Sequence, residues 1–223
     1  MSMHVVIAGA HGRVARRLGR LLSARGDTVI GIVRSEGHEA DLSADGVEPV
    51  VLDLERAATQ DLAAIIVVAD AVVFAAGAPP DSGVQRKDAV DRAAALRLAD
   101  AAAEAAVRPF LLMSSMGVES GAEGQIPAGY DDERVGYLRA KLAAEEGVRA
   151  RPAVAATILR PGRLTEDPGS GLVTLGRHLS PGTVSRDDVA AVMLALLDAP
   201  RPGTVLELVS GTTPIQEAVS GSA

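Results

Sequence analysis

Hydrophobic runs and amphipathic stretches alternate along the whole chain. Short apolar runs such as His4-Val-Val-Ile-Ala-Gly have the continuous hydrophobicity of strands that are buried on both faces. Between these runs, apolar residues recur at helical spacing, as at Val14, Leu18 and Leu22. The patterns predict strands at residues 4–9, 28–33, 47–52, 71–74, 109–113, 155–159 and 204–209, and helices at 13–25, 59–64, 88–107, 137–148 and 187–197.

This alternation predicts one α/β domain over residues 1–223, built as a doubly wound parallel sheet of about seven strands with helices on both faces. Such sheets bind ligands beyond the carboxyl ends of their strands. We expect residues 1–115 to form a cofactor-binding half and residues 116–185 to face the substrate. Residues 164–184 are rich in Gly and Pro and are expected as a long loop, and Ser185 is expected to cap the next helix.

The amino-acid composition excludes several classes of protein. The chain has 48% hydrophobic and 23% charged residues, enough apolar residues for a sizeable core. It has no Cys, which excludes disulfides and thiol catalysis. A net charge of −7 with two Tyr, two Phe and no Trp argues against nucleic-acid binding.

Other patterns concern location and metal binding. The apolar stretch 62–80 is too interrupted to span a membrane, and no basic stretch precedes the first strand, so we expect a cytoplasmic protein. His4 and His38 have no partners at metal-ligand spacing, and no metal site is expected. The acidic pairs at 131–132 and 145–146 are expected on solvated faces.

A glycine-rich turn follows the first predicted strand and opens the first helix. It has a G-x-x-G-x-x-A pattern, in which glycines allow backbone N–H groups to approach a pyrophosphate at the helix N-terminus. Two interpretations of His11 are open. Its side chain could donate a hydrogen bond to a phosphate, or it could be a polar residue that merely tolerates the turn geometry. The candidate cofactor-binding residues here are Gly9, Ala10, His11, Gly12, Arg13 and Val14.

The second strand ends at Arg34, and no carboxylate follows until Glu36. NAD sites usually place an acidic residue there for the ribose 2′-hydroxyl, whereas NADP sites place an Arg nearby. Arg34 and Arg13 could both reach a 2′-phosphate, so NADP is preferred over NAD. The alternative is that Arg34 is a solvated charge at a strand end.

Two further strand ends carry candidates for the same cofactor. Asp53 could accept from the adenine amino group while Leu54 covers the ring, although an Asp at this position is often only a helix cap. After the next strand, the small residues Ala75, Ala76 and Gly77 would let the backbone lie against a ribose.

A hydride-transfer site is indicated by a Ser-Ser strand end and a downstream Y-x-x-x-K. Tyr137 and Lys141 are one helical turn apart and share a face, and an ammonium stabilises a phenolate. Ser115 could orient a substrate carbonyl while Tyr137 donates a proton, and Lys141 could also bond the nicotinamide ribose. The residues alone do not decide between Ser114 and Ser115.

These stretches together resemble the atypical short-chain dehydrogenase/reductases, in particular the biliverdin reductase B-like and NmrA-like group. The resemblance lies in GAHGRVARRL, VLDLE, VVFAAG, LLMSSMG, YLRAK, ILRPGRL, SRDDVAAVML and VLELVSGTTPIQEA. It implies a Rossmann fold, with Ser115, Tyr137 and Lys141 in catalytic positions and Pro161 and Gly162 near the nicotinamide. The third motif position is Ala15 instead of Gly, a tolerated variant.

The predicted function is reduction of a small molecule, a carbonyl or a conjugated flavin-, bilin- or quinone-like acceptor, by NADPH. A non-catalytic NADP(H) redox sensor is the alternative, and a sugar-nucleotide epimerase is disfavoured because little chain follows Pro161. Residues 162–184 and 119–132 are expected to build the substrate pocket. An oligomer is possible, and the sequence does not identify the substrate.

Overall fold

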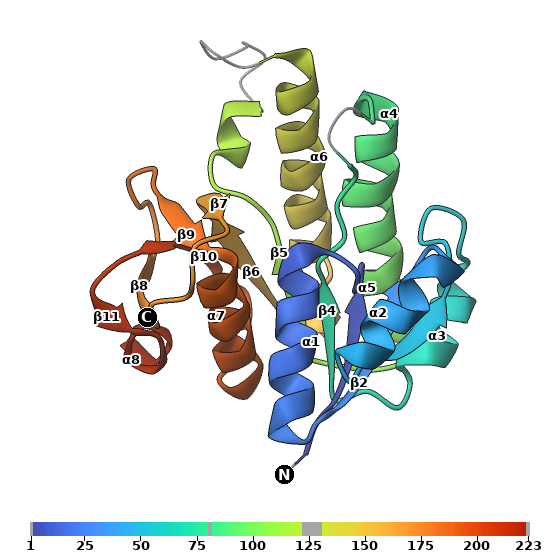
Figure 1. Ribbon diagram of the computed structural model, residues 1–223. Coiled ribbons are helices and arrows are strands. Elements are labelled where there is room, and N and C mark those ends of the chain that lie inside the picture. The colour runs from blue at the N-terminus through green and yellow to red at the C-terminus, as the bar shows by residue number, and fades with distance from the viewer. Residues whose placement is uncertain (1, 80–81, 122–130, 222–223) are drawn as a thin grey trace.

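The protein has a central, mostly parallel sheet between two layers of helices (Figure 1). The computed structural model describes residues 2–79, 82–121 and 131–221. The strand order in the sheet is β11-β8-β10-β6-β5-β4-β1-β2-β3. Its parallel strands are β1 His4–Ala8, β2 Thr28–Val33, β3 Glu48–Val51, β4 Ala71–Phe74, β5 Phe110–Met113, β6 Ala156–Pro161 and β10 Val205–Ser210.

The strand order reverses at β1. Val6 of β1 pairs with Ile30 of β2 on one side and with Val72 of β4 on the other, although β4 comes after β3 along the chain. A doubly wound sheet binds its ligand in the crevice at such a switch point. The topology therefore predicts a ligand site at the carboxyl ends of β1, β2 and β4.

The core is divided by the sheet because successive strand residues point to opposite faces. Val5 and Ile7 of β1 pack in the cluster that includes α1 (Arg13–Arg25) and α7 (Arg186–Asp198), which lie side by side (Figure 1). Val6 and Ala8 pack in the other cluster. That face is covered by α3 Thr59–Ile66, α5 Ala94–Glu104 and α6 Asp132–Arg149.

The predicted α/β architecture is confirmed, but the prediction of about seven strands was too low. Residues 164–184, expected as a loop, contain β8 (Leu172–Gly176), which pairs antiparallel with β10 and with β11 (Thr213–Pro214). Val173 of β8 is fully buried, so this strand gains core contacts and covers the edge of β10. A small separate sheet joins β7 (Arg163–Thr165) to β9 (Thr183–Ser185).

Several helix boundaries differ from the expected ones. α6 begins at Asp132 instead of residue 137, because the side chain of Asp131 caps it by accepting from the Arg134 N–H at 2.7 Å. The helix expected at 88–107 begins earlier, and its parts are α4 Val84–Lys87, a π-helical turn Asp88–Ala93 and α5. The remaining helices are α2 Glu39–Ala44 and α8 Ile215–Gly221. Among the described residues, no helix is long and apolar enough to cross a membrane.

Candidate functional site

The glycine-rich turn packs directly against the end of β4. Gly9 has a φ of +79°, and a Cβ added there would lie 2.5 Å from the Cα of Ala76. The N–H groups of Gly9 and Ala10 both point to the carbonyl oxygen of Ile32 at 3.1 Å, which ties the turn to β2. Only glycine fits at position 9, because the backbone there is left-handed and the neighbouring segment at Ala76 leaves no space for a side chain.

The N-terminus of α1 presents free backbone donors at this turn. Gly12 caps the helix without a side-chain hydrogen bond, and the first intrahelical bond runs from the Arg16 N–H to the Gly12 carbonyl at 2.8 Å. The N–H groups of Arg13 and Val14 therefore belong to the unsatisfied first turn. A helix terminus with this geometry favours a phosphate group, so the turn fits the pyrophosphate of a dinucleotide.

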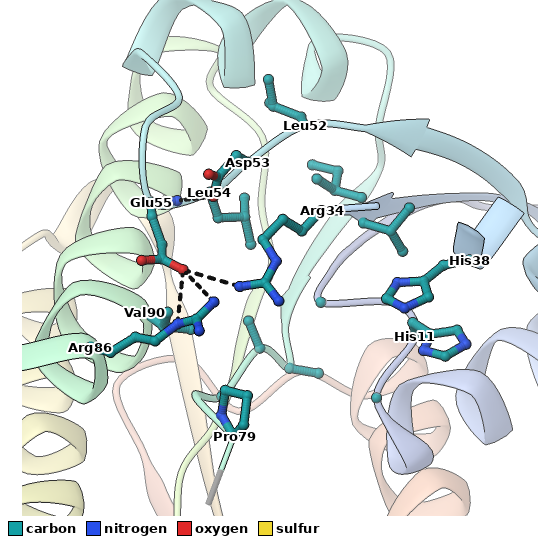
Figure 2. Close-up of a pocket in the computed structure, with 17 residues that line it drawn as sticks. His11, Arg34, His38, Leu52, Asp53, Leu54, Glu55, Pro79, Arg86 and Val90 are labelled. Atoms are coloured by element: carbon teal, nitrogen blue, oxygen red, sulfur yellow. Dashed lines mark hydrogen bonds and ion pairs between the residues drawn. The ribbon is translucent and has the colours of Figure 1, made fainter. Parts of the chain in front are cut away.

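A cavity of about 310 Å³ lies between this turn and the ends of β2, β3 and β4 (Figure 2). It brings together predicted residues from four separate segments. Those lining it are Gly9, His11, Gly12, Arg34, Asp53, Leu54, Ala75, Ala76 and Gly77. The predicted residues outside its lining are Ala10, Arg13, Val14, Ser115, Tyr137, Lys141, Pro161 and Gly162.

Two charged residues that the sequence analysis missed lie in this cavity. Glu55 Oε1 is 3.4 Å from Arg34 Nη1 and accepts from Arg86 Nη2 at 3.1 Å (Figure 2). The guanidinium of Arg97 donates to the carbonyl oxygens of Leu54 and Glu55 at 2.6 and 3.1 Å and holds this loop in place. Arg86 comes from α4, more than 50 residues after Arg34, and no local pattern connects the two.

The side chain of Arg13 forms an ion pair outside the cavity. Its Nη1 lies 2.5 Å from Glu166 Oε1, and its side chain is 69% exposed. Arg17 and Arg186 contact the same carboxylate at 3.1 and 2.8 Å. The expected pairing of Arg13 with Arg34 around one phosphate therefore requires Arg13 to leave Glu166.

Lys141 is buried at the ends of β4 and β5. Its Nζ is 3.0 Å from Asp91 Oδ1, and both side chains are almost inaccessible, at 3% and 0% exposed. The ammonium also donates to the carbonyls of Ala76 at 3.3 Å and Met113 at 3.1 Å, so it joins the ends of β4 and β5. Burial lowers the pKa of Lys141, but the charge of Asp91 opposes it and raises the pKa above its ordinary value.

Tyr137 lies half-buried one turn before Lys141 on α6. The Lys141 ammonium is 5.9 Å from the centre of the phenol ring, and the Arg134 guanidinium is 5.3 Å from it. The two cations therefore flank the phenol.

The two serines after β5 have different surroundings. Ser114 is buried and donates its hydroxyl to Glu145, whereas the half-buried Ser115 donates to the carbonyl of Met116 at 3.2 Å. Glu145 was expected on a solvated face, and this expectation was wrong. It is 2% exposed, and Arg160 donates to it from Nε and Nη2 at 2.9 and 2.6 Å.

The end of β6 adjoins the serines. The N–H of Met116, the residue after Ser115, donates to the carbonyl of Pro161 at 3.0 Å. Gly162 packs so closely that an added Cβ would lie 2.5 Å from the Gly182 carbonyl oxygen. Of the segment 119–132 expected to complete the substrate pocket, residues 122–130 lie outside the described part of the chain.

Comparisons with known proteins place the chain among nicotinamide-cofactor-binding proteins. A family described as NAD(P)H-binding matches residues 9–200. A Bacillus subtilis (strain 168) protein named as the uncharacterised sugar epimerase YhfK is 32% identical over 219 residues, covering 97% of this chain and 99% of that protein.

Two solved structures extend the comparison. A Bacillus halodurans protein described as an NAD-dependent epimerase/dehydratase matches with a TM-score of 0.87 and 30% identity, covering 98% of this chain and 99% of that one. The Lactococcus lactis oxidoreductase ylbE matches with a TM-score of 0.82 and 26% identity, covering 98% and 95%. The similarity therefore extends over nearly the whole length of each chain.

Proposed function

Because the chain belongs to the NAD(P)H-binding family, we propose that it is an NADPH-dependent reductase of a small carbonyl compound or of a conjugated flavin-, bilin- or quinone-like acceptor. Membership of this family confirms the resemblance to the atypical short-chain dehydrogenase/reductases. The observation that carries the proposal is the cavity that the glycine-rich turn shares with Arg34 and Asp53. Its position at the switch point of the sheet, beside the N-terminus of α1, supports a site for the adenosine and pyrophosphate parts of a dinucleotide.

Arg34 supports the preference for NADP(H). Its guanidinium lines the cavity at the end of β2, where NAD-binding proteins usually carry a carboxylate. Arg86 faces the same space from α4. Two guanidinium groups suit a phosphate monoester, to which Arg can donate two parallel hydrogen bonds. Truncation of Arg34 to Ala should therefore weaken NADPH binding about tenfold to a hundredfold and leave NADH binding within about threefold.

The proposed chemistry uses groups on β5 and α6. A bound nicotinamide supplies the hydride. Tyr137 donates a proton to the substrate oxygen, and Ser115 orients that oxygen, because Ser114 is already committed to Glu145. Lys141 acts through its neighbours in this proposal. It keeps a positive charge 5.9 Å from the phenol ring and fixes the strand ends that carry the site.

The test is turnover of NADPH by the purified protein against aldehydes, quinones, flavins and bilins. Tyr137→Phe should lower kcat for a carbonyl substrate at least about tenfold, while NADPH affinity stays within about threefold. Ser115→Ala should act in the same direction, with Ser114→Ala as the matched comparison that mainly lowers stability. Unchanged turnover in Tyr137→Phe would show that this phenol does not donate the proton.

The relatives named as epimerases favour a second candidate, an epimerase that recycles its cofactor. The two possibilities differ in stoichiometry. A reductase consumes one NADPH per product, whereas an epimerase shows no net oxidation of the cofactor and should convert a sugar nucleotide into its epimer, because the hydride removed from the sugar carbon is returned to it. A protein that binds NADP(H) tightly but does neither would fit the non-catalytic sensor.

A further inference from the structure

Two imidazole rings lie stacked in the cavity, away from Glu55. The ring centres of His11 and His38 are 3.7 Å apart, and their planes differ by 2°. His11 belongs to the glycine-rich turn and His38 to a short 3₁₀ helix after β2, and both line the cavity. In Figure 2 the rings lie on the opposite side of Arg34 from Glu55. No motif in the sequence marks His38 as a site residue.

His11 is held in a fixed orientation. Its Nε2 lies 2.8 Å from Asp41 Oδ2, and Arg16 Nη1 lies 3.3 Å from the same oxygen. The hydrogen bond to His11 and the charge of Arg16 hold the pKa of Asp41 below its ordinary value, so the carboxylate is ionised and the ring donates to it. His11 thereby forms a rigid platform against which His38 packs.

The charges that face His38 come from the glycine-rich turn, the end of β2 and α2. Burial, the nearby His11 and the guanidinium of Arg34 lower the pKa of His38, whereas Asp41 raises it, and the net direction is down. These neighbours together therefore favour the neutral form of the His38 ring. The remaining charged groups of the cavity are Glu55 and Arg86, which pair with each other, and Asp53, which accepts from the Glu55 N–H at 3.0 Å. A dianion placed beside Arg34 would favour protonation of His38.

We propose that His38, braced by His11, is a proton-linked contact for the 2′-phosphate of NADP(H). The phosphate binds as a dianion, the neutral imidazole takes one proton from solvent to form a second ring N–H, and no other bond forms or breaks. This inference rests on the NADP(H) preference proposed above. It adds that discrimination against NAD(H) increases as the pH falls from about 8.5 to 6.5, while Arg34 supplies a contribution that does not depend on pH in this range.

Isothermal titration calorimetry with NADP⁺ and NAD⁺ tests the proposal, because the two ligands differ only in the 2′-phosphate. Titrations in buffers of different ionisation enthalpy count the protons taken up. NADP⁺ should bind with uptake of a fraction of a proton near pH 7.5, and its affinity should fall by up to about tenfold between pH 6.5 and 8.5. NAD⁺ should show neither effect.

Three variants sharpen the test. His38→Gln keeps a polar side chain but cannot become charged, so NADP⁺ affinity should lose its pH dependence while NAD⁺ affinity is unchanged. His11→Phe keeps an aromatic platform without a charge, and the pH dependence should move to higher pH because the repulsion of His38 is removed. His4→Gln, at an exposed position at the start of β1, is the matched control and should behave as the wild type.

The outcomes separate this inference from the proposed function. An NADP⁺ preference with the same pH profile in the wild type and in His38→Gln would overturn the role of His38 and leave the cofactor preference intact. NADP⁺ binding no tighter than NAD⁺ at any pH would overturn both. If His38→Gln also loses NAD⁺ affinity, the test rests on the His11→Phe variant. A pH profile of NADP⁺ affinity that is the same in His11→Phe as in the wild type then refutes the proposal.

Discussion

The buried ion pair between Lys141 and Asp91 offers a sharp test of how the site is held together. The perturbation is Asp91→Asn, which keeps the shape of the side chain and an acceptor for the Ala78 N–H, now bonded at 3.0 Å. It removes the opposing charge from an ammonium that is 3% exposed. Lys141 would then have to remain charged without its ionic partner or lose its proton.

The expected cost follows from the geometry. At a separation of 3.0 Å, two unit charges attract by about 5 kcal/mol if the effective dielectric constant is about 20. Loss of one partner of a buried pair typically costs about 3–5 kcal/mol. With a denaturant slope of about 3 kcal/mol per molar urea, the unfolding midpoint should fall by roughly 1–1.7 M.

The pH dependence of this cost has a definite sign. In the wild type the folded pKa of Lys141 is raised, so its stabilisation is fully present below the unfolded pKa of about 10.4 and is lost only as the pH rises through the folded value. In Asp91→Asn the effect of burial prevails and the folded pKa is depressed. The free energy of unfolding of the variant should therefore increase as the pH rises from about 7 to 10.

Urea unfolding at several pH values, monitored by circular dichroism, measures both effects. Asp91→Asn with Lys141→Met should recover part of the lost stability, because no buried charge remains unpaired. The matched control is Asp88→Asn, which breaks the half-exposed Asp88–Arg92 pair and should cost less than about 1 kcal/mol. An Asp91→Asn variant that loses no more than this control would refute the assignment of Lys141 as a buried structural charge.

Three further predictions concern the cavity and the network beside it. Glu55→Gln removes the internal anion that holds Arg34, so NADPH affinity measured by fluorescence should rise about threefold to tenfold; equal weakening of NADPH and NADH would instead assign Glu55 to ribose binding. Gly9→Ala should abolish dinucleotide binding and lower the melting temperature, because the new Cβ would collide with Ala76; normal titration would disprove the close approach. Glu145→Gln should destabilise the protein by about 1–3 kcal/mol in urea unfolding, since the buried Arg160 loses its buried carboxylate and keeps only Glu119 and Glu207, and no measurable change would contradict this.

Local patterns predicted the features whose physical cause is local. The glycine-rich turn could be placed from its motif because a tight left-handed bend between a strand and a helix demands glycine at Gly9. Arg34 and Asp53 could be assigned to one cavity because the ends of neighbouring parallel strands meet at the same edge of the sheet. The strand at 172–176 was missed because its pairing partner, β10, lies about 30 residues further along the chain.

Charged residues on the inner face of α6 show where local interpretation failed. Lys141 and Glu145 fall on the same stripe as Leu138 and Val148, which are fully buried. A charge on an apolar stripe requires a buried partner, and this signal was available in the sequence. The identity of the partner was not available in the sequence, because Asp91, which pairs with Lys141, lies 50 residues away along the chain.

The sequence by itself determined the seven parallel strands with the main helices between them, the glycine-rich turn and the first cation of the cavity, since each depends on residues within a few positions of one another. Only the tertiary structure decided that Glu55, Arg86 and His38 share that cavity and that Lys141 is buried. These facts depend on the packing of elements distant in sequence, where the loss of hydration must be balanced by a charge that another element supplies.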